Sequence, residues 1–599
     1  MKTTTQRLVI AVGSLVSFAC VAFVAKINDQ GDFRRWHYDN PPPSVSDNVF
    51  NRETKAIRFS FAEEAFSESS RAQELNAIRS AFGQWEAVPH SIIDFEEGPL
   101  VPNAFDINPG DGTNIVKWVR NSTLVNGGKS DISGRLGSAF TLFFADGRMA
   151  AADIVLNGVE HDWFSDPATP KPEAHFIEGT VIHELGHVLG LDHTPLGAGT
   201  MFARDGSGVG FQSGLSSDEI SFAQSVYGDE NARRSLGSIE GTVQASGQGI
   251  LGAGLFLETP SGHLVAGTVS IEATAGNSQG FYQFLGVPPG DYFIRAQPLD
   301  ASSASRTLVK GRDVSFSRFN QAEVNFTATE PLPVSVIQGQ QTRVDLTLNL
   351  TPPTFRIDRI RQFTDSPTGI RSGNAAITLT QGDQDKTIGV FGTTLPITDV
   401  ELLITGDGLT LGPTEVTTQF FSNLPHLFRT VSVSSDATPG LRSFIVRRGA
   451  DRAYASGFIE IRALEPDDNF DGLSDNFQRL HFAPFTSPEA APTADPDEDG
   501  RTNAEEAQMG SSPIVPTESS IPNSELSIQQ VSLNASGATI SFESLAGISY
   551  QLFTRDHVTD SPWVPIGDPV TGNGSLQSIT DASAEADIRF YELRASASR

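Results

Sequence analysis

Apolar residues follow two different periods in the first third of the chain. Residues 71–88 place them at the spacing of a single helix face, and residues 215–228 combine a serine start, acids in the first turn and a closing glycine. Other short segments alternate or run apolar as strands do: residues 57–61, 113–119 and the two halves of 137–158, which meet at a turn at 145–147. This mixture predicts one α+β domain over residues 33–228.

After residue 228 the helical period almost disappears. Short runs of Val, Ile, Phe and Thr recur between clusters of Gly, Pro, Asn and Asp, at the spacing typical of β-sandwiches. We therefore predict three all-β domains, at residues 235–350, 354–463 and 525–599. The second is predicted to be immunoglobulin-like from its strand pattern alone. An acidic, proline-rich segment at residues 465–516 separates the last two.

Length, charge and cysteine content narrow the class of protein. A chain of 599 residues exceeds what one hydrophobic core supports, which agrees with several domains. Its net charge of -30 argues against nucleic acid and anionic membrane surfaces as partners, because such a chain repels phosphate at long range. Cys20 is the only cysteine, so the chain has no disulfide framework.

The first residues have the pattern of a secretory signal. Lys2 and Arg7 precede an apolar run at residues 8–25, and small residues allow cleavage after Ala22. The same run is long enough for an uncleaved membrane anchor, which is the alternative. We predict a signal peptide at residues 1–22 and a secreted or cell-surface protein without stable membrane insertion after cleavage.

Three of the eleven histidines lie within residues 183–193. In a helix, His183 and His187 stand one turn apart on the same face, and Gly190 can end the helix so that His193 returns to the same ion. Three neutral imidazoles leave zinc one open position for water, whose proton Glu184 is placed to accept. The alternative is a buried helix whose histidines only satisfy hydrogen bonds, and it needs five specified positions to coincide by chance.

The pattern HExxHxxGxxH resembles that of the metzincin metallopeptidases, and within them the matrixins found in many secreted bacterial proteins. Met201 lies eight residues after His193, as in the methionine turn that metzincins place beneath the zinc. The resemblance covers about residues 33–228. It implies a zinc-dependent endopeptidase that hydrolyses peptide bonds of proteins with a metal-activated water.

The resemblance also implies a strand that binds substrate. The segment ADIVLNG is similar to the edge strand that lines the matrixin cleft, and an extended peptide would pair with it backbone to backbone. The expected residues are Ala152, Asp153, Ile154, Val155 and Leu156. An ordinary sheet edge without a substrate is the alternative.

This chain departs from the matrixin pattern in two places. It has no cysteine available for a propeptide that caps the zinc, and the loop that holds a second, structural zinc in animal enzymes retains only Asp146. His161 and His175 could bind metal, but isolated histidines are more typical of surface or core positions.

The acidic segment contains the pattern of a calcium loop. Residues 495–506 place carboxylates at positions 1, 3, 5 and 12, a glycine at position 6 and a backbone carbonyl at position 7: Asp495, Asp497, Asp499, Glu506, Gly500 and Arg501. An upstream loop repeats the spacing, with Gln478 in place of the bidentate glutamate, and should bind calcium more weakly: Asp467, Asn469, Asp471 and Asp475. Both loops resemble calcium-binding repeats related to thrombospondin type 3 and EF-hand loops. A solvated acidic linker is the alternative.

The predicted architecture is therefore multidomain: an α+β metzincin-like catalytic domain, several all-β sandwiches and a calcium-loop linker. Residues 236–300 resemble the carboxypeptidase regulatory-like sandwich, which is related to transthyretin, through the landmarks GTV, GA and PPGDY. We expect the β domains to bind extracellular protein or glycan, or to act as spacers. The alternative function is a non-catalytic adhesin with a vestigial metal domain, against which the intact Glu184 and its three histidines argue.

Overall fold

A computed structural model describes most of the chain after residue 22. The described residues are 23–102, 106–204, 212–299, 308–314, 325–363, 370–373, 375–418, 424–515, 528–534, 537–544, 548–555, 563–583 and 589–597. The predicted signal peptide, residues 1–22, lies outside them. The chain divides into two compact units, Met1–Arg479 with Ala483–Ser487, and Leu480–Phe482 with Pro488–Arg599.

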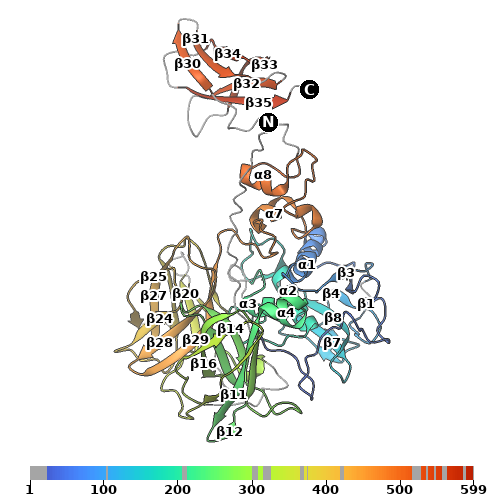
Figure 1. Cartoon of the computed structure of the whole chain (residues 1–599), viewed down its shortest axis with the longest axis vertical. Coiled ribbons are helices and arrows are strands. Elements are labelled where there is room, and N and C mark those ends of the chain that lie inside the picture. Colours follow the sequence, from blue (N-terminus) through green and yellow to red (C-terminus); the bar gives the residue numbers. More distant parts are fainter. Residues whose placement is uncertain are drawn as a thin grey trace, which may run out of the picture. The chain divides into compact units, whose positions relative to one another are not determined.

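The first unit begins with a mixed sheet and two long helices (Figure 1). Its strands lie in the order β1-β2-β4-β8-β7, with β3 also paired to β2: β1 (Phe50–Asn51), β2 (Ala56–Phe61), β4 (Ile115–Val119), β8 (Met149–Asn157), β7 (Gly137–Phe143) and β3 (Phe95–Glu97). The helices are α1 (Arg71–Glu86), α2 (Ile177–Leu189), α3 (Ser217–Val226) and α4 (Glu230–Ser235). The fully buried Trp85 of α1 donates from its indole to the carbonyl of Ile182 at 3.0 Å, so α1 and α2 are locked together in one core.

The strand predicted to bind substrate lies inside this sheet. Strand β8 pairs in parallel with β4 through Val116↔Ile154 and antiparallel with β7 through Gly137↔Leu156. The prediction that residues 152–156 pair with a peptide is therefore wrong, because both backbone edges of the strand are already hydrogen-bonded. The edge position belongs to β7, and no other strand in the described part of the chain pairs with it.

The predicted carboxypeptidase regulatory-like region forms a two-sheet sandwich around its own core. One sheet contains β11 (Gly237–Ala245), β12 (Gln248–Gly249), β15 (Phe281–Val287), β18 (Gln341–Arg343) and β19 (Leu346–Thr347). The facing strands are β13 (Ala253–Glu258), β14 (Leu264–Val269), β16 (Gly290–Pro298) and β17 (Leu332–Val336). A short helix, α5 (Gly311–Val314), lies between β16 and β17 in the sequence.

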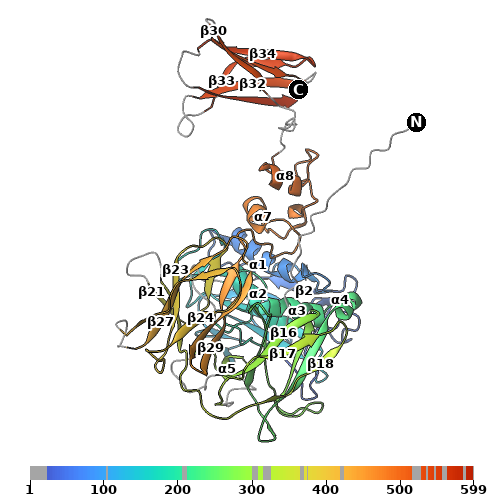
Figure 2. The ribbon, with the colours of Figure 1, turned by 60° about the vertical axis from the view of Figure 1, so that its left-hand side comes forward.

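The next sandwich shares a sheet with the first one. Its first layer contains β20 (Arg359–Phe363), β21 (Ile370–Gly373), β23 (Lys386–Phe391), β25 (Leu409–Leu411), β26 (Glu415–Thr417) and β27 (His426–Val433). Its second layer contains β22 (Ile377–Thr380), β24 (Glu401–Ile404), β28 (Gly440–Arg448) and β29 (Asp451–Arg462). The pairing Leu264↔Leu441 joins β14 to β28, so the two sandwiches, predicted as separate, share one eight-stranded sheet. Strand β16 of the first sandwich and strand β29 of the second lie near each other in both Figure 1 and Figure 2.

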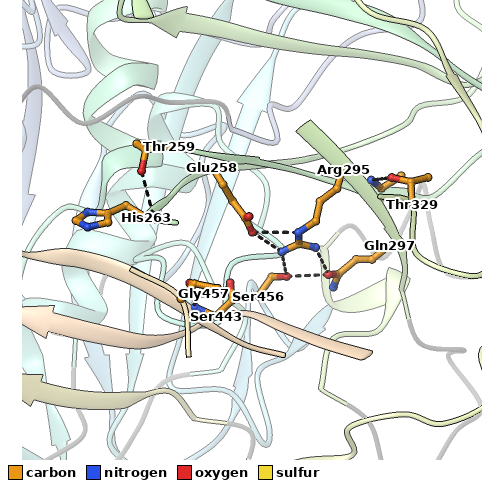
Figure 3. A network of polar contacts seen from close by, with 11 residues as sticks. Glu258, Thr259, His263, Arg295, Gln297, Thr329, Ser443, Ser456 and Gly457 are labelled. Carbon is orange, nitrogen blue, oxygen red and sulfur yellow. Dashed lines mark hydrogen bonds and ion pairs between the residues drawn. The ribbon is translucent and has the colours of Figure 1, made fainter. Parts of the chain in front are cut away.

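A buried ionic network fastens the two sandwiches to each other (Figure 3). The Arg295 side chain of β16 is fully buried and donates twice to Glu258 Oε1, at 3.0 and 2.8 Å. The same guanidinium donates to the Ser456 hydroxyl of β29 at 2.7 Å and to Gln297 Oε1 at 2.6 Å. A buried charge is tolerated only when it is paired and hydrogen-bonded, so this network holds β16 and β29 in a defined position.

The second unit contains the main acidic loop and the C-terminal domain. Two three-stranded sheets surround a small core: β30 (Ile528–Asn534), β31 (Gly537–Glu543) and β34 (Leu576–Asp581), and β33 (Val564–Thr571), β32 (Ile548–Arg555) and β35 (Phe590–Ala597). The division between the units falls within α7 (Asp475–His481), so the acidic segment at 465–516 contributes to both. Within the described residues, no helix is long and apolar enough to cross a membrane.

Candidate metal centre

The helix that carries two of the three histidines is fixed by its apolar face. Val181, Ile182, Leu185, Val188 and Leu189 of α2 are all fully buried in the core. The helix stops at Gly190, whose φ of 118° is left-handed. A Cβ at this position would lie 2.0 Å from the Arg34 carbonyl oxygen, so only glycine fits.

All three imidazoles are oriented by backbone carbonyls. The Nδ1 atoms of His183 and His187 lie 2.8 Å from the carbonyl oxygens of Thr200 and Leu191, and Nδ1 of His193 lies 2.6 Å from that of Asp313. A carbonyl only accepts hydrogen bonds, so each Nδ1 carries the proton and each Nε2 presents its lone pair.

These lone pairs converge on one point. The ligand atoms of the three histidines all lie within 4.8 Å of one another, and Nε2 of His187 lies 3.1 Å from Nε2 of His193. Zn–N bonds of about 2.0–2.1 Å in a tetrahedral site would separate two such nitrogens by roughly 3.3 Å. Burial lowers the pKa of His187 well below its usual value and that of His193 to about 4, so both are neutral at pH 7. The donor set therefore fits zinc.

Glu184 lies beside the histidines with one carboxylate oxygen available for chemistry. Burial raises the pKa of Glu184 to about 7, although the backbone N–H of Ala139 in β7 and the charge of Lys26 oppose the shift. Its Oε2 is buried and has no hydrogen-bond partner among the described residues. Any side chain at position 137 would crowd Glu184, because a Cβ on Gly137 would lie 2.9 Å from Glu184 Oε1. A carboxylate with this pKa is suited to general-base catalysis near neutral pH.

Met201 packs beneath α2. Its side chain is 1% exposed, and a Cβ on Gly186 would lie 2.3 Å from its sulfur. Its backbone N–H donates to Glu219 Oε1 of α3 at 3.0 Å. The glycine between the two helical histidines is therefore a packing requirement that we did not infer from the sequence.

The histidines and Glu184 open onto a cleft of about 740 Å³. Its walls come from the start of β7, from α2 and from residues after His193, and they include six side chains that sequence reasoning did not place there: Lys26, Arg135, His161, His175, Arg204 and Asp313. His161 and His175 have rings 5.3 Å apart. The parallel pairing of β9 (Trp163–Phe164) with β10 (His175–Phe176) draws them together, and no local pattern signals such a pairing.

The main acidic loop brings its carboxylates close to one another. Ligand oxygens of Asp495, Asp497 and Asp499 lie within 4.8 Å of one another. The Asp495 carboxylate accepts from the backbone N–H groups of Asp499 and Gly500, at 3.2 and 2.9 Å. Glu506, at the twelfth position, is fully buried, and Gly500 adopts a φ of 89° at the sharp turn. The carboxylates of this loop are thus arranged by backbone donors around a common centre.

The upstream loop, residues 467–478, is held together by different hydrogen bonds from those of the main acidic loop. Asp471 Oδ2 accepts from the side-chain amides of Asn469 and Gln478, at 2.9 and 2.7 Å. Burial and the charge of Asp468 raise the pKa of Asp475, which disfavours its ionised form. Arg479, which follows the loop, forms a double ion pair with Glu178 of α2 at 2.8 and 2.6 Å. In this loop, side-chain amides therefore contact the Asp471 oxygen that a cation would otherwise bind.

Residues 50–228 match the Matrixin family model. This region is matrixin-like. No curated protein matches the chain as a relative. Solved structures similar to parts of it include the major pilin subunit BcpA of Bacillus cereus (10% identity, 38% of this chain and 69% of that chain, TM-score 0.14) and titin domains A168–A170 (8%, 57% and 82%, 0.11). Domains 4 and 5 of the S-layer protein SbsC are also similar to part of the chain (10% identity, 30% of this chain and 70% of that chain, TM-score 0.11). TM-scores this low do not support any inference about fold or function.

The matrixin-like region supports a zinc metallopeptidase at the level of the family. The metal-ligand geometry is consistent with that class, because the histidines of the motif converge and its glutamate faces the same cleft.

Proposed function

We propose that this chain is a secreted zinc-dependent endopeptidase that hydrolyses peptide bonds of proteins. The single observation that carries the proposal is the convergence of three imidazoles beside a buried carboxylate, one oxygen of which has no hydrogen-bond partner among the described residues. His183, His187 and His193 would hold zinc through their Nε2 atoms. When bound, zinc supplies the positive charge that polarises the scissile carbonyl and the attacking water.

Glu184 performs the proton transfers in this proposal. Its free Oε2 accepts a proton from the attacking water, and its raised pKa allows it to pass that proton to the leaving amine. The substrate would add to the outer edge of β7 as an extended strand, because residues 137–139 of β7 line the same cleft as Glu184. Edge strand β7 thus takes the role that we first assigned to residues 152–156.

The test is digestion of denatured protein or casein by the purified mature chain. Glu184→Gln should lower kcat/KM by about 10²–10⁴-fold, the usual contribution of a general base, while leaving one zinc per chain. Glu53→Gln, which removes an exposed carboxylate far from the cleft in sequence, is the matched control and should be fully active. A wild-type chain that holds zinc but cleaves nothing would support the non-catalytic adhesin instead.

Secretion, calcium and partners belong to the same proposal. The signal pattern at residues 1–22 supports export, and loop 495–506 would bind calcium through Asp495, Asp497, Asp499, Glu506 and the carbonyl of Arg501. The upstream loop would bind calcium weakly, because amide donors already satisfy Asp471. The β domains would bind extracellular protein or glycan. Isothermal titration of calcium into wild type and Glu506→Gln tests the loop assignment.

A further inference from the structure

The loop that carries the third histidine is held by the downstream β domains. Residues 193–202 contain His193 and Met201, and they run from the end of the metal motif to the methionine turn. The carbonyls that orient His183 and His187 belong to Thr200 and Leu191, both within the matrixin-like region. His193 differs from them, because its partner comes from beyond residue 300.

Helix α5 of the first sandwich contacts His193 at two atoms. The carbonyl of Asp313 accepts from Nδ1 at 2.6 Å, and the carbonyl of Val314 accepts from the backbone N–H of His193 at 3.2 Å. The Asp313 carboxylate pairs with Arg204 and accepts from the backbone N–H of Lys310 at 3.0 Å. Val314 is fully buried in the core of the second sandwich. The carbonyl that orients His193 is thus anchored on both sides.

The middle of the loop lies against β29. The backbone N–H groups of Gly197 and Ala198 donate to the carbonyls of Ser456 and Gly457, at 3.1 and 2.7 Å. A Cβ on Gly197 would lie 2.4 Å from the Phe458 ring, so the approach is as close as glycine permits. Ser456 also accepts from the buried Arg295 (Figure 3), and the loop is therefore tied to the network that joins the two sandwiches.

We propose that the downstream β domains complete the metal site, with the Asp313 carbonyl as the positioning group for His193. This inference rests on the proposed zinc function. Hydrogen bonds to the second nitrogen of a ligating histidine set its tautomer and ring orientation. A site whose third ligand is set from outside its own domain depends on the domain interface for its metal affinity.

The experiment measures zinc affinity of the full chain by competition with a fluorescent chelator, and coordination from the absorption spectrum of the cobalt-substituted protein. Asp313→Ala removes the carboxylate contacts that anchor the carbonyl on one side and should weaken zinc affinity about 10–100-fold, with a changed cobalt spectrum. Asp313→Asn keeps an acceptor for Lys310 N–H and should restore most of that loss. Glu401→Ala, which breaks the exposed pair with Arg447, is the matched control and should bind zinc as wild type does.

A second variant tests the contact between the loop and β29. Gly197→Val places a side chain against Phe458 and should weaken zinc binding, and thermal unfolding of the same variant checks that the β domains remain folded. Wild-type zinc affinity and cobalt spectra in both Asp313→Ala and Gly197→Val would overturn the inference. Absence of zinc binding in the wild type would instead overturn the proposed function, so the two failures are distinguishable.

Discussion

The histidine cluster and the acidic loop at 495–506 are two candidate cation sites built by opposite means. Both bring three ligand atoms within 4.8 Å of one another. Backbone carbonyls at residues 191, 200 and 313 orient the histidines. The loop instead crowds carboxylates within a few consecutive residues, where Asp499 and Gly500 N–H groups hold Asp495.

This difference determines what the absence of a metal should do. Each imidazole is held by a hydrogen bond to a backbone carbonyl, so the zinc-free cluster should keep its shape. Carboxylates a few ångströms apart repel each other, and the loop needs a cation to balance that repulsion. Zinc should therefore act mainly in chemistry, and calcium in the stability of its own loop.

The largest expected effect comes from removing one imidazole. His187→Ala leaves two protein ligands and should abolish stoichiometric zinc binding, with loss of all detectable peptidase activity. Metal analysis of the dialysed protein measures this. The far-ultraviolet circular dichroism should stay close to that of wild type, because the cluster does not hold the fold together. Global unfolding of the variant would contradict the comparison.

Acid should destabilise the zinc-free protein through the same histidines. The pKa of His193 is about 4 in the folded chain and that of an unperturbed histidine about 6.5, so the unfolded chain binds the proton first as pH falls. Stability should therefore decrease between pH 6.5 and 4, by up to about 3 kcal/mol from this group. Urea unfolding at several pH values measures it. A His193→Gln variant should show a shallower pH dependence.

Calcium removal should act on the other site. At 100 times its dissociation constant, calcium would stabilise the folded loop by about 2.7 kcal/mol. Chelation should expose residues 488–515 to limited digestion by a chelator-tolerant protease, while residues 467–478, held by amides and by Arg479–Glu178, stay protected. Cleavage that is identical with and without calcium would mean that the segment is only a linker.

The smallest effect is expected beneath the zinc site. Met201→Leu keeps volume and apolarity and should cost less than about 1.5 kcal/mol, with zinc stoichiometry retained. Thermal unfolding and metal analysis of the same sample check both statements. If Met201→Leu lost zinc as completely as His187→Ala, the methionine would have to be a ligand and not a packing residue.

The sequence alone was enough to predict features that depend on residues close together along the chain. The one-turn spacing of His183 and His187 and the stop at Gly190 follow from helical geometry, and α2 ends at Leu189. The twelve-residue spacing of the acidic loop is equally local. The prediction that the upstream loop binds calcium more weakly also rests on one residue, Gln478, whose amide contacts Asp471.

Only the tertiary structure determined the strand order, the joining of the sandwiches and the partner of His193, because these features depend on residues that are distant in sequence. The alternation of apolar and polar residues shows which face of a strand is buried, but it does not show where the strand lies in a sheet. The pairing of β4 with β8 places β8 inside the sheet and β7 at its edge. The joined sheet of the two sandwiches follows from the pairing of Leu264 with Leu441. No local pattern relates His193 to Asp313, which is 120 residues away, and yet that contact orients the third histidine.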